Sequence, residues 1–276
     1  MNKFYIQIVF FILSVSIYLN NKTLATEPAP GKNTKTKTKT KGKEEEDTKS
    51  NKSNSTSEKI YEKNKDKLCT NPKETKEAIE LMSEAVMHLV HHATNEDDYV
   101  LEGEDISGDM FYYRKKYKGK IIVEKMKCIS NNPNKYDTKI NKLWDPKNPG
   151  FFNHFSFKAK IVRVYNPDLV MIQKRFKDSM FGQWKYFYAL VKKTQLSDDT
   201  TVIVMSSANI NDHHPSKEEY KNTIIESANL FETDIDSEDD IRNGKLKKTF
   251  VNIAGYLIKK TDKSVSTIFV TSVSDI

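Results

Sequence analysis

Three histidines on one predicted helix are the first candidates for chemistry. His88 and His92 are one helical turn apart and would share a face, with His91 beside them. Two such histidines can bind zinc, but the metalloprotease pattern H-E-x-x-H requires a glutamate directly after the first histidine, and Leu89 occupies that position. We therefore interpret the three histidines as solvated or helix-end side chains.

An acidic segment begins like a calcium-binding loop. Asp234, Asp236 and Glu238 have the spacing of the first ligands of such a loop. The sixth position, which needs glycine, is Asp239, and the twelfth, which needs glutamate, is Lys245. The spacing therefore predicts a solvated acidic loop.

The patterns of nucleotide binding and hydrolysis are missing from the sequence. The nine glycines include no G-x-G pair, and there is no G-x-S-x-G elbow. Gly103 and Gly108 have the P-loop spacing, but Asp109 stands where that loop needs lysine. With no recognisable nucleophile and base, we predict that the chain is not an enzyme and uses neither a cofactor nor a metal.

Arginine and tyrosine side chains are the better candidates, and their chemistry is binding. Arg163 alternates with Ile161 and Tyr165 on a predicted strand, and Arg175 lies near the end of the next strand. A guanidinium in an apolar cavity would bind phosphate through paired hydrogen bonds, and the rings of Tyr165 and Tyr188 could hold a quaternary ammonium group. A position at the solvent side of the sheet is the open alternative for both arginines.

Two central strands would position these side chains. Residues 184–193 and 201–208 are rich in β-branched and aromatic residues, and the polar cluster 197–200 separates them. Neither strand has a polar face, so the sheet must be covered on both faces, by helices, a second sheet or a ligand. The predicted lining of an internal cavity is Tyr188, Leu190, Ile203 and Met205.

The remaining elements complete an α+β domain with a mostly antiparallel sheet. Asn71 and Pro72 mark the start of a helix that Asn95 ends. A short helix is expected over residues 134–144, and further strands are expected at 99–104, 110–116, 120–129, 160–165, 169–176, 224–231, 250–258 and 265–274. The loop between two of these strands carries three large apolar residues, Met180, Phe181 and Trp184. Such a loop either acts as a lid or membrane contact, or folds onto the core.

The N-terminal residues resemble a targeting segment. An apolar run at 4–19 follows Lys3, and small residues at 23 and 25 suit a cleavage site, so we predict a signal peptide at 1–25, with an uncleaved anchor as the alternative. Residues 26–59 are low-complexity and predicted to be disordered, and residues 60–276 are predicted to form one domain. In a secretory pathway, Cys69 and Cys128 would form one disulfide or remain two buried thiols.

The charge distribution argues against nucleic-acid binding. The formal charge is +7, but residues 1–60 hold 11 of the 45 basic and 6 of the 38 acidic residues. The rest of the chain has 34 basic and 32 acidic residues, a formal charge of +2, so the folded part lacks the basic excess that such binding needs.

Several stretches of the chain resemble START lipid-transfer domains in order and spacing: residues 166–169, 206–208, 254–258 and 265–274. More closely, the chain resembles the fam-a proteins of malaria parasites over nearly all of residues 60–276, through residues 60–65, 143–146, 161–167, 208–212, 223–229 and 250–257. The resemblance implies a START-like helix-grip fold, in which a curved antiparallel sheet and a C-terminal helix enclose one lipid. Here the sequence ends directly after the last predicted strand, so that helix is expected to be short or missing, and the 224–231 strand would help to close the cavity.

We therefore predict a secreted protein that binds phosphatidylcholine and transfers it with transient membrane contact. Arg163, Tyr165, Arg175, Tyr188, Leu190, Ile203 and Met205 would bind the lipid, and Met180, Phe181 and Trp184 would form the lid. Export to the host cell or the parasitophorous vacuole is an open extension, although no arginine precedes Arg114 to supply an export motif. The alternative is a host-facing surface or interaction protein that has the same fold without lipid transfer.

Overall fold

The computed structural model describes residues 56–119, 121–152, 154–216 and 219–275. The predicted signal peptide and nearly all of the low-complexity segment lie outside these residues. The helices are α2 (Thr56–Lys63), α3 (Pro72–Thr94), α4 (Tyr136–Trp144) and α5 (Asp239–Arg242), and the short 3-10 helices are η1 (Lys65–Lys67), η2 (Pro133–Lys135) and η3 (Glu226–Asn229). Among the described residues no helix is long and apolar enough to cross a membrane.

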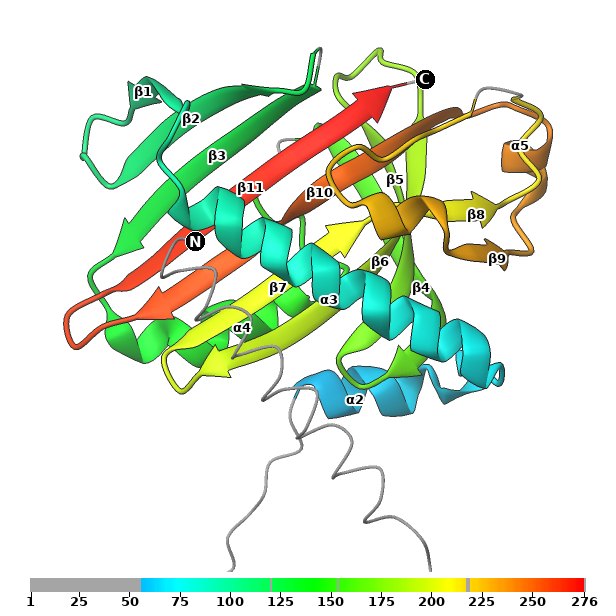
Figure 1. Ribbon diagram of the computed structural model, residues 1–276, viewed down its shortest axis with the longest axis horizontal. Coiled ribbons are helices and arrows are strands. Elements are labelled where there is room, and N and C mark those ends of the chain that lie inside the picture. Colours follow the sequence, from blue (N-terminus) through cyan, green and yellow to red (C-terminus); the bar gives the residue numbers. More distant parts are fainter. Residues whose placement is uncertain (1–55, 120, 153, 217–218, 276) are drawn as a thin grey trace, which may run out of the picture. The chain divides into compact units, whose positions relative to one another are not determined.

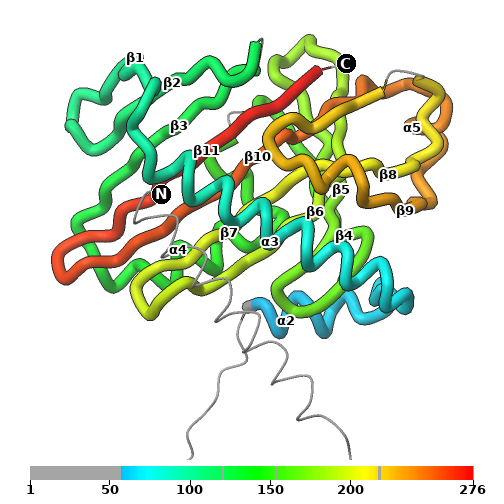
Figure 2. Tube along the Cα trace, in the orientation of Figure 1, coloured from blue at the N-terminus to red at the C-terminus, as the bar shows by residue number. Residues whose placement is uncertain are grey.

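A single nine-stranded sheet forms the centre of the fold (Figures 1 and 2). Its strand order is β1-β2-β3-β11-β10-β7-β6-β5-β4, and all neighbours in that order are antiparallel. The strands are β1 (Val100–Glu104), β2 (Met110–Tyr117), β3 (Ile121–Ser130), β4 (Ser156–Asn166), β5 (Leu169–Lys177), β6 (Lys185–Ser197), β7 (Thr200–Ser206), β10 (Lys247–Lys260) and β11 (Val265–Asp275). Two short strands, β8 (Asn209–Asn211) and β9 (Glu232–Asp234), pair in parallel outside it. The predicted α+β class with an antiparallel sheet is confirmed.

Helix α3 covers one face of the sheet, as Figure 1 shows in cyan. The Asn71 side chain caps it by accepting hydrogen bonds from the backbone N–H groups of Lys73 and Glu74, at 3.0 and 3.3 Å. Its apolar residues at helical spacing, among them Leu81 and Leu89, are buried against strand residues of the same core cluster. The helix predicted from Asn71, Pro72 and the apolar stripe is confirmed.

Helix α4 and residues 145–152 pack against the opposite face. Tyr136, Ile140 and Trp144 are buried there with strand residues of a second core cluster. The Tyr136 hydroxyl also makes a 2.9 Å hydrogen bond with the Thr201 hydroxyl. The sheet is therefore covered on both faces, as its two apolar faces required. In the described residues no helix follows β11.

One local prediction is wrong, and the cause is side-chain hydrogen bonding. The predicted strand at 224–231 is a turn followed by η3, because the Asn222 side chain accepts from the N–H groups of Ile224 and Ile225, both at 3.0 Å. The Asn229 side chain donates back to the Asn222 carbonyl at 2.8 Å, so local bonds replace a strand ladder. The predicted acidic loop at 234–240 is a loop over residues 235–238, and its end residues belong to β9 and α5.

Candidate ligand-binding site

A small cavity lies between the sheet and the α4 side of the molecule. Its volume is about 40 Å³, and among its lining residues are Trp144, Phe152, Ile161, Ile172, Lys174, Val191, Ile203, Met205 and Tyr256. This is room for about one or two water molecules. Side chains therefore nearly fill the space in which a lipid was expected.

A much larger groove opens on the same face, over β2, β3 and β11. Its volume is about 540 Å³, within the range of small-molecule sites. Its aromatic and aliphatic lining residues are Tyr112, Tyr113, Ile122, Met126, Phe151, Phe152, Phe269 and Val273, and Glu102, Glu124 and Lys125 are among the polar ones. Tyr112, Ile122 and Val273 remain 42–43% exposed, so apolar surface faces solvent here.

Phe151 and Phe152 stand where the cavity and the groove meet. Phe152 lines both spaces, and its ring packs edge-on against Phe269 at 5.2 Å. The Phe151 N–H donates to the Tyr256 hydroxyl at 3.1 Å. A β-carbon at Gly150 would lie 2.1 Å from that hydroxyl oxygen, so the segment approaches Tyr256 as closely as only glycine permits. Displacement of this segment would join the cavity to the groove.

The four predicted cavity-lining residues fall on two different faces of the sheet. Ile203 and Met205 line the small cavity. Leu190 and Tyr188 belong instead to the core cluster beneath α3, where the Tyr188 hydroxyl accepts a hydrogen bond from Gln173 at 2.5 Å. Period-two alternation was read correctly within each strand, but the pairing of faces between the strands was not, since a one-residue difference in register exchanges them.

Arg163 and Tyr165 also lie on the α3 face, away from both spaces. The Arg163 guanidinium donates to Glu74 at 2.7 Å, to the Asp234 carbonyl at 2.8 Å and to the Thr233 hydroxyl. Tyr165, 5% exposed, donates its hydroxyl to the same Glu74 carboxylate at 2.8 Å. This arginine joins β4 to α3 and β9 and has no donor directed at the cavity.

Arg175 is likewise bound to carboxylates of its own chain. It donates to both Asp240 oxygens, at 2.6 and 3.0 Å, and forms an ion pair with Glu238 at 2.9 Å. Burial alone would raise the pKa of Glu238, but hydrogen bonds from Lys160 and Gln173 lower it to about 2. Arg175 therefore fixes the segment that carries α5 onto the sheet. No pattern in the sequence indicates that acidic residues about 65 positions away would reach this arginine.

The three predicted lid residues have different environments. Met180 is 60% exposed and Phe181 is 95% exposed, so both present apolar surface to solvent. Trp184 is half-buried against the α3-side cluster, with the ammonium groups of Lys158 and Lys177 at 5.8 and 5.4 Å from its ring. Two of the three thus remain available for a membrane contact.

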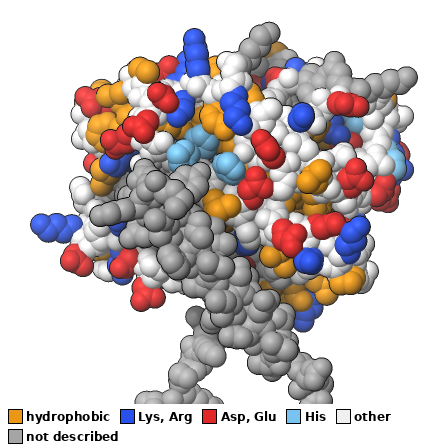
Figure 3. All heavy atoms as spheres, viewed as in Figure 1, with side chains coloured by type: hydrophobic (Ala, Val, Ile, Leu, Met, Phe, Trp, Pro, Cys, Tyr) orange, Lys and Arg blue, Asp and Glu red, His pale blue; other side chains and the backbone are white. Residues whose placement is uncertain are grey.

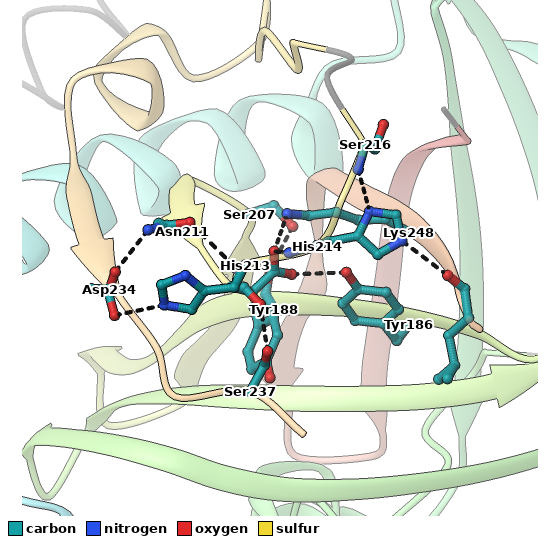
Figure 4. Close-up of polar contacts among 12 residues, drawn as sticks. Tyr186, Tyr188, Ser207, Asn211, His213, His214, Ser216, Asp234, Ser237 and Lys248 are labelled. Carbon is teal, nitrogen blue, oxygen red and sulfur yellow. Dashed lines mark hydrogen bonds and ion pairs between the residues drawn. The ribbon is translucent and has the colours of Figure 1, made fainter. Parts of the chain in front are cut away.

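A buried polar cluster surrounds Asp212 in the segment after β8 (Figure 4). Asp212 is 1% exposed and accepts hydrogen bonds from the Tyr186 hydroxyl at 2.9 Å and from Lys248 at 2.7 Å. Its backbone carbonyl accepts from Ser237. Burial and the neighbouring carboxylate raise the pKa of Tyr186 far above its usual value. The charges of Asp212 and Lys248 balance, which is typical of a structural cluster.

The histidines and cysteines do not form a site. Figure 3 shows histidine side chains grouped on the face that carries α3. His92 is buried, bonds to the Tyr99 hydroxyl at 2.9 Å, and has a pKa lowered by burial to about 3. His88 lies 3.5 Å from Glu84. No group of three metal-binding side chains occurs in the part of the chain described, and Cys69 and Cys128 are free thiols.

Lys174, on the sheet face opposite α3, is a polar residue that no sequence pattern singled out. It lies on β5, lines the small cavity and is only 4% exposed. Its ammonium group lies 4.2 Å from the centre of the Phe152 ring and 5.0 Å from that of Phe157. Burial lowers its pKa to about 8. Strict alternation with Val170, Ile172 and Phe176 would have placed it on this face.

Comparison with known proteins gives structural similarity only. No family model matches the chain, and no curated protein matches its sequence. The structure is similar to human STARD10, at TM-score 0.47 and 12% identity over 68% of this chain and 66% of that one. It is also similar to human StAR-related lipid transfer protein 5, at TM-score 0.49 and 10% identity over 71% and 82% of the two chains. A STAR-related lipid transfer protein from Xanthomonas axonopodis matches at TM-score 0.40 and 5% identity, over 65% and 82%.

At such low identities and TM-scores, these similarities assign no activity to the chain. The sheet order, the cavity and the groove of the chain itself are therefore the observations that bear on function.

Proposed function

We propose that this chain binds a lipid on the sheet face opposite α3 and carries it between membranes without covalent chemistry. The observation that supports this most directly is the groove of about 540 Å³, lined by aromatic and aliphatic side chains that remain partly exposed. Exposed contiguous apolar surface in a folded domain commonly marks a ligand or membrane contact. Two of the structurally similar proteins are named for lipid transfer, which agrees with the proposal.

The energetics require that the groove close around its ligand. An acyl chain of ~16 methylenes loses ~13 kcal/mol of hydrophobic stabilisation when it enters water, at ~0.8 kcal/mol per methylene. An open groove shields only part of such a chain. Displacement of Phe151 and Phe152 would extend the groove into the small cavity and cover more of it. The lipid-bound state would therefore differ from the present one at residues 150–152.

The finer features remain part of the proposal. Residues 1–25 support secretion, and the resemblance to fam-a proteins supports phosphatidylcholine as the lipid. The exposed Met180 and Phe181 side chains would enter the membrane surface during transfer. Export beyond the producing cell is a further step that the same resemblance suggests.

The second candidate is an interaction protein that has the same fold but an interior filled by its own side chains. The observation that favours it is the cavity of about 40 Å³, which has no room for a lipid while Phe152 is in place. In that case the partly exposed residues of the groove would contact a protein partner instead.

Lipid extraction and native mass spectrometry of the purified chain, followed by transfer between labelled liposomes, test the proposal. We expect one bound lipid and measurable transfer. Ile122→Glu places a charge in the groove and should reduce transfer about tenfold or more, because a carboxylate there opposes burial of an acyl chain. Leu230→Glu is the matched control, since Leu230 is 82% exposed and lies outside the groove. No bound lipid and no transfer by the unmodified chain would favour the interaction protein.

A further inference from the structure

We propose that Lys174 binds the anionic head of the ligand, a carboxylate or a phosphate, at the small cavity beside Phe152. This inference rests on the proposed lipid binding and specifies the chemistry of the lipid. It also replaces Arg163 and Arg175 as the predicted anion-binding groups, because both already bind acidic groups on the α3 side.

The surroundings of Lys174 lack the partner that a buried cation needs. Among the described residues its ammonium group has neither an ion pair nor a hydrogen bond, and the rings of Phe152 and Phe157 lie beside it. Other shielded lysines of the chain do have oxygen partners: Lys192 donates to Ser83 at 3.0 Å, Lys125 to the Asn95 carbonyl at 2.8 Å and Lys248 to Asp212 at 2.7 Å.

The two rings do not replace the missing oxygen. A cation–π contact contributes much less free energy than a buried ammonium group loses when its hydration is removed. A buried cation without an oxygen partner is therefore costly in the ligand-free protein, and an anionic ligand would remove that cost.

Two further polar atoms on this face also lack partners. The indole nitrogen of Trp144 and Nε2 of His154 are buried without a hydrogen bond in the described part of the chain. Trp144 lines the same cavity as Lys174, and an indole N–H can only donate. The His154 ring stacks on Phe176 at 4.1 Å, and burial together with the charge of Lys174 lowers its pKa to about 4. Near neutral pH Lys174 thus supplies a cation and Trp144 an unsatisfied donor, while His154 is neutral.

Phe152 connects the anion site to the groove. Its ring contacts the ammonium group of Lys174 on the cavity side and forms part of the wall of the groove. If this ring turns away, an oxyanion can take its place against Lys174 while the attached hydrocarbon chain lies in the groove. The same movement would open the space and supply the missing partner.

The test compares three ligands that share one oleoyl chain: oleate, oleoyl lysophosphatidate and the neutral monoolein. Their affinities are measured by calorimetry for the full chain and for Lys174→Met, which keeps the side-chain length and removes the charge. We expect Lys174→Met to weaken binding of an anionic ligand about tenfold or more and to leave monoolein within about twofold, since charged hydrogen bonds are the strong ones. Lys192→Met is the matched control, because Lys192 is a shielded lysine of the α3 face.

The outcomes separate the two sources of the anion. A loss with oleate alone assigns a carboxylate, a loss with lysophosphatidate alone assigns a phosphate, and a loss with both assigns either oxyanion. Equal affinities of the unmodified chain and Lys174→Met for both anionic ligands would overturn the role of Lys174, as would an equal loss in Lys192→Met. If the role of Lys174 is overturned in either way but monoolein still binds the unmodified chain, lipid binding stands and only the anion site fails. If none of the three ligands binds the unmodified chain, the proposed function fails as well.

Discussion

Replacement of Lys174 by methionine should stabilise the ligand-free protein, and the gain should depend on pH. Burial lowers the pKa of Lys174 from 10.5 to about 8. At 1.36 kcal/mol per pKa unit this corresponds to ~3 kcal/mol of destabilisation whenever the lysine is charged in both the folded and unfolded states. Lost cation–π contacts would offset ~1 kcal/mol. We therefore expect Lys174→Met to raise the free energy of unfolding by ~2 kcal/mol at pH 7.

The direction of the pH dependence follows from proton uptake on unfolding. Below about pH 8 Lys174 is protonated in both states, so its full cost is present. Between pH 8 and 10.5 the unfolded chain binds more protons than the folded one, so the stability of the unmodified protein rises with pH relative to the variant. The advantage of Lys174→Met should therefore shrink steadily from pH 8 to pH 10.

Urea unfolding at pH 7 and at pH 10 measures this difference directly. Lys259→Met is the control, because Lys259 is exposed at the end of β10 and its replacement should change stability by no more than ~0.5 kcal/mol at either pH. A variant less stable than the unmodified protein at pH 7, or an advantage that does not change with pH, would show that Lys174 is not held as an unpaired buried amine.

Two further substitutions test the rest of the site. Arg175→Gln leaves Glu238 and Asp240 without their shared cation, so urea unfolding should show a free energy of unfolding lowered by ~2–4 kcal/mol. The affinity for oleate should not change. A weaker affinity for oleate in the folded variant would show that Arg175 belongs to the ligand site. Gly150→Ala places a β-carbon 2.1 Å from the Tyr256 hydroxyl oxygen at a backbone φ of +63°. Urea unfolding should therefore show a free energy of unfolding lowered by ~1–3 kcal/mol. Unchanged stability would mean that the segment around Gly150 moves aside freely.

The sequence predicted well those parts of the fold that depend on local chemistry. Asn71 and Pro72 define the start of α3, and the apolar stripe that follows needs only the helical period to be recognised. The central strands likewise follow from β-branched and aromatic residues on both faces. The prediction at 224–231 failed because Asn222 and Asn229 form side-chain bonds that the apolar pattern of Ile224 and Ile225 does not reveal.

The candidate site was harder to predict because its partners come from distant parts of the chain. Arg163 and Arg175 looked available for phosphate only as long as Glu74 and Asp240 could not be placed beside them. Lys174 was not predicted as a site residue, because the prediction for this strand rested on Arg175. Arg175 is one residue further on and lies on the other face of the sheet. The assembled sheet determines which basic residue lacks a partner. The sequence of β5 alone does not show this.

The contrast between the two faces finally locates the ligand. On the α3 face Arg163, Arg175 and Lys248 each bind a carboxylate, so an incoming anion would have to displace one. On the opposite face Lys174 has neither an ion pair nor a hydrogen bond among the described residues, and the partly exposed groove lies directly beyond Phe152. A lipid that presents an oxyanion to Lys174 and its chain to the groove would satisfy a buried charge and cover exposed apolar surface in one step. No comparable gain is available on the α3 face, where the shielded basic side chains already have oxygen partners.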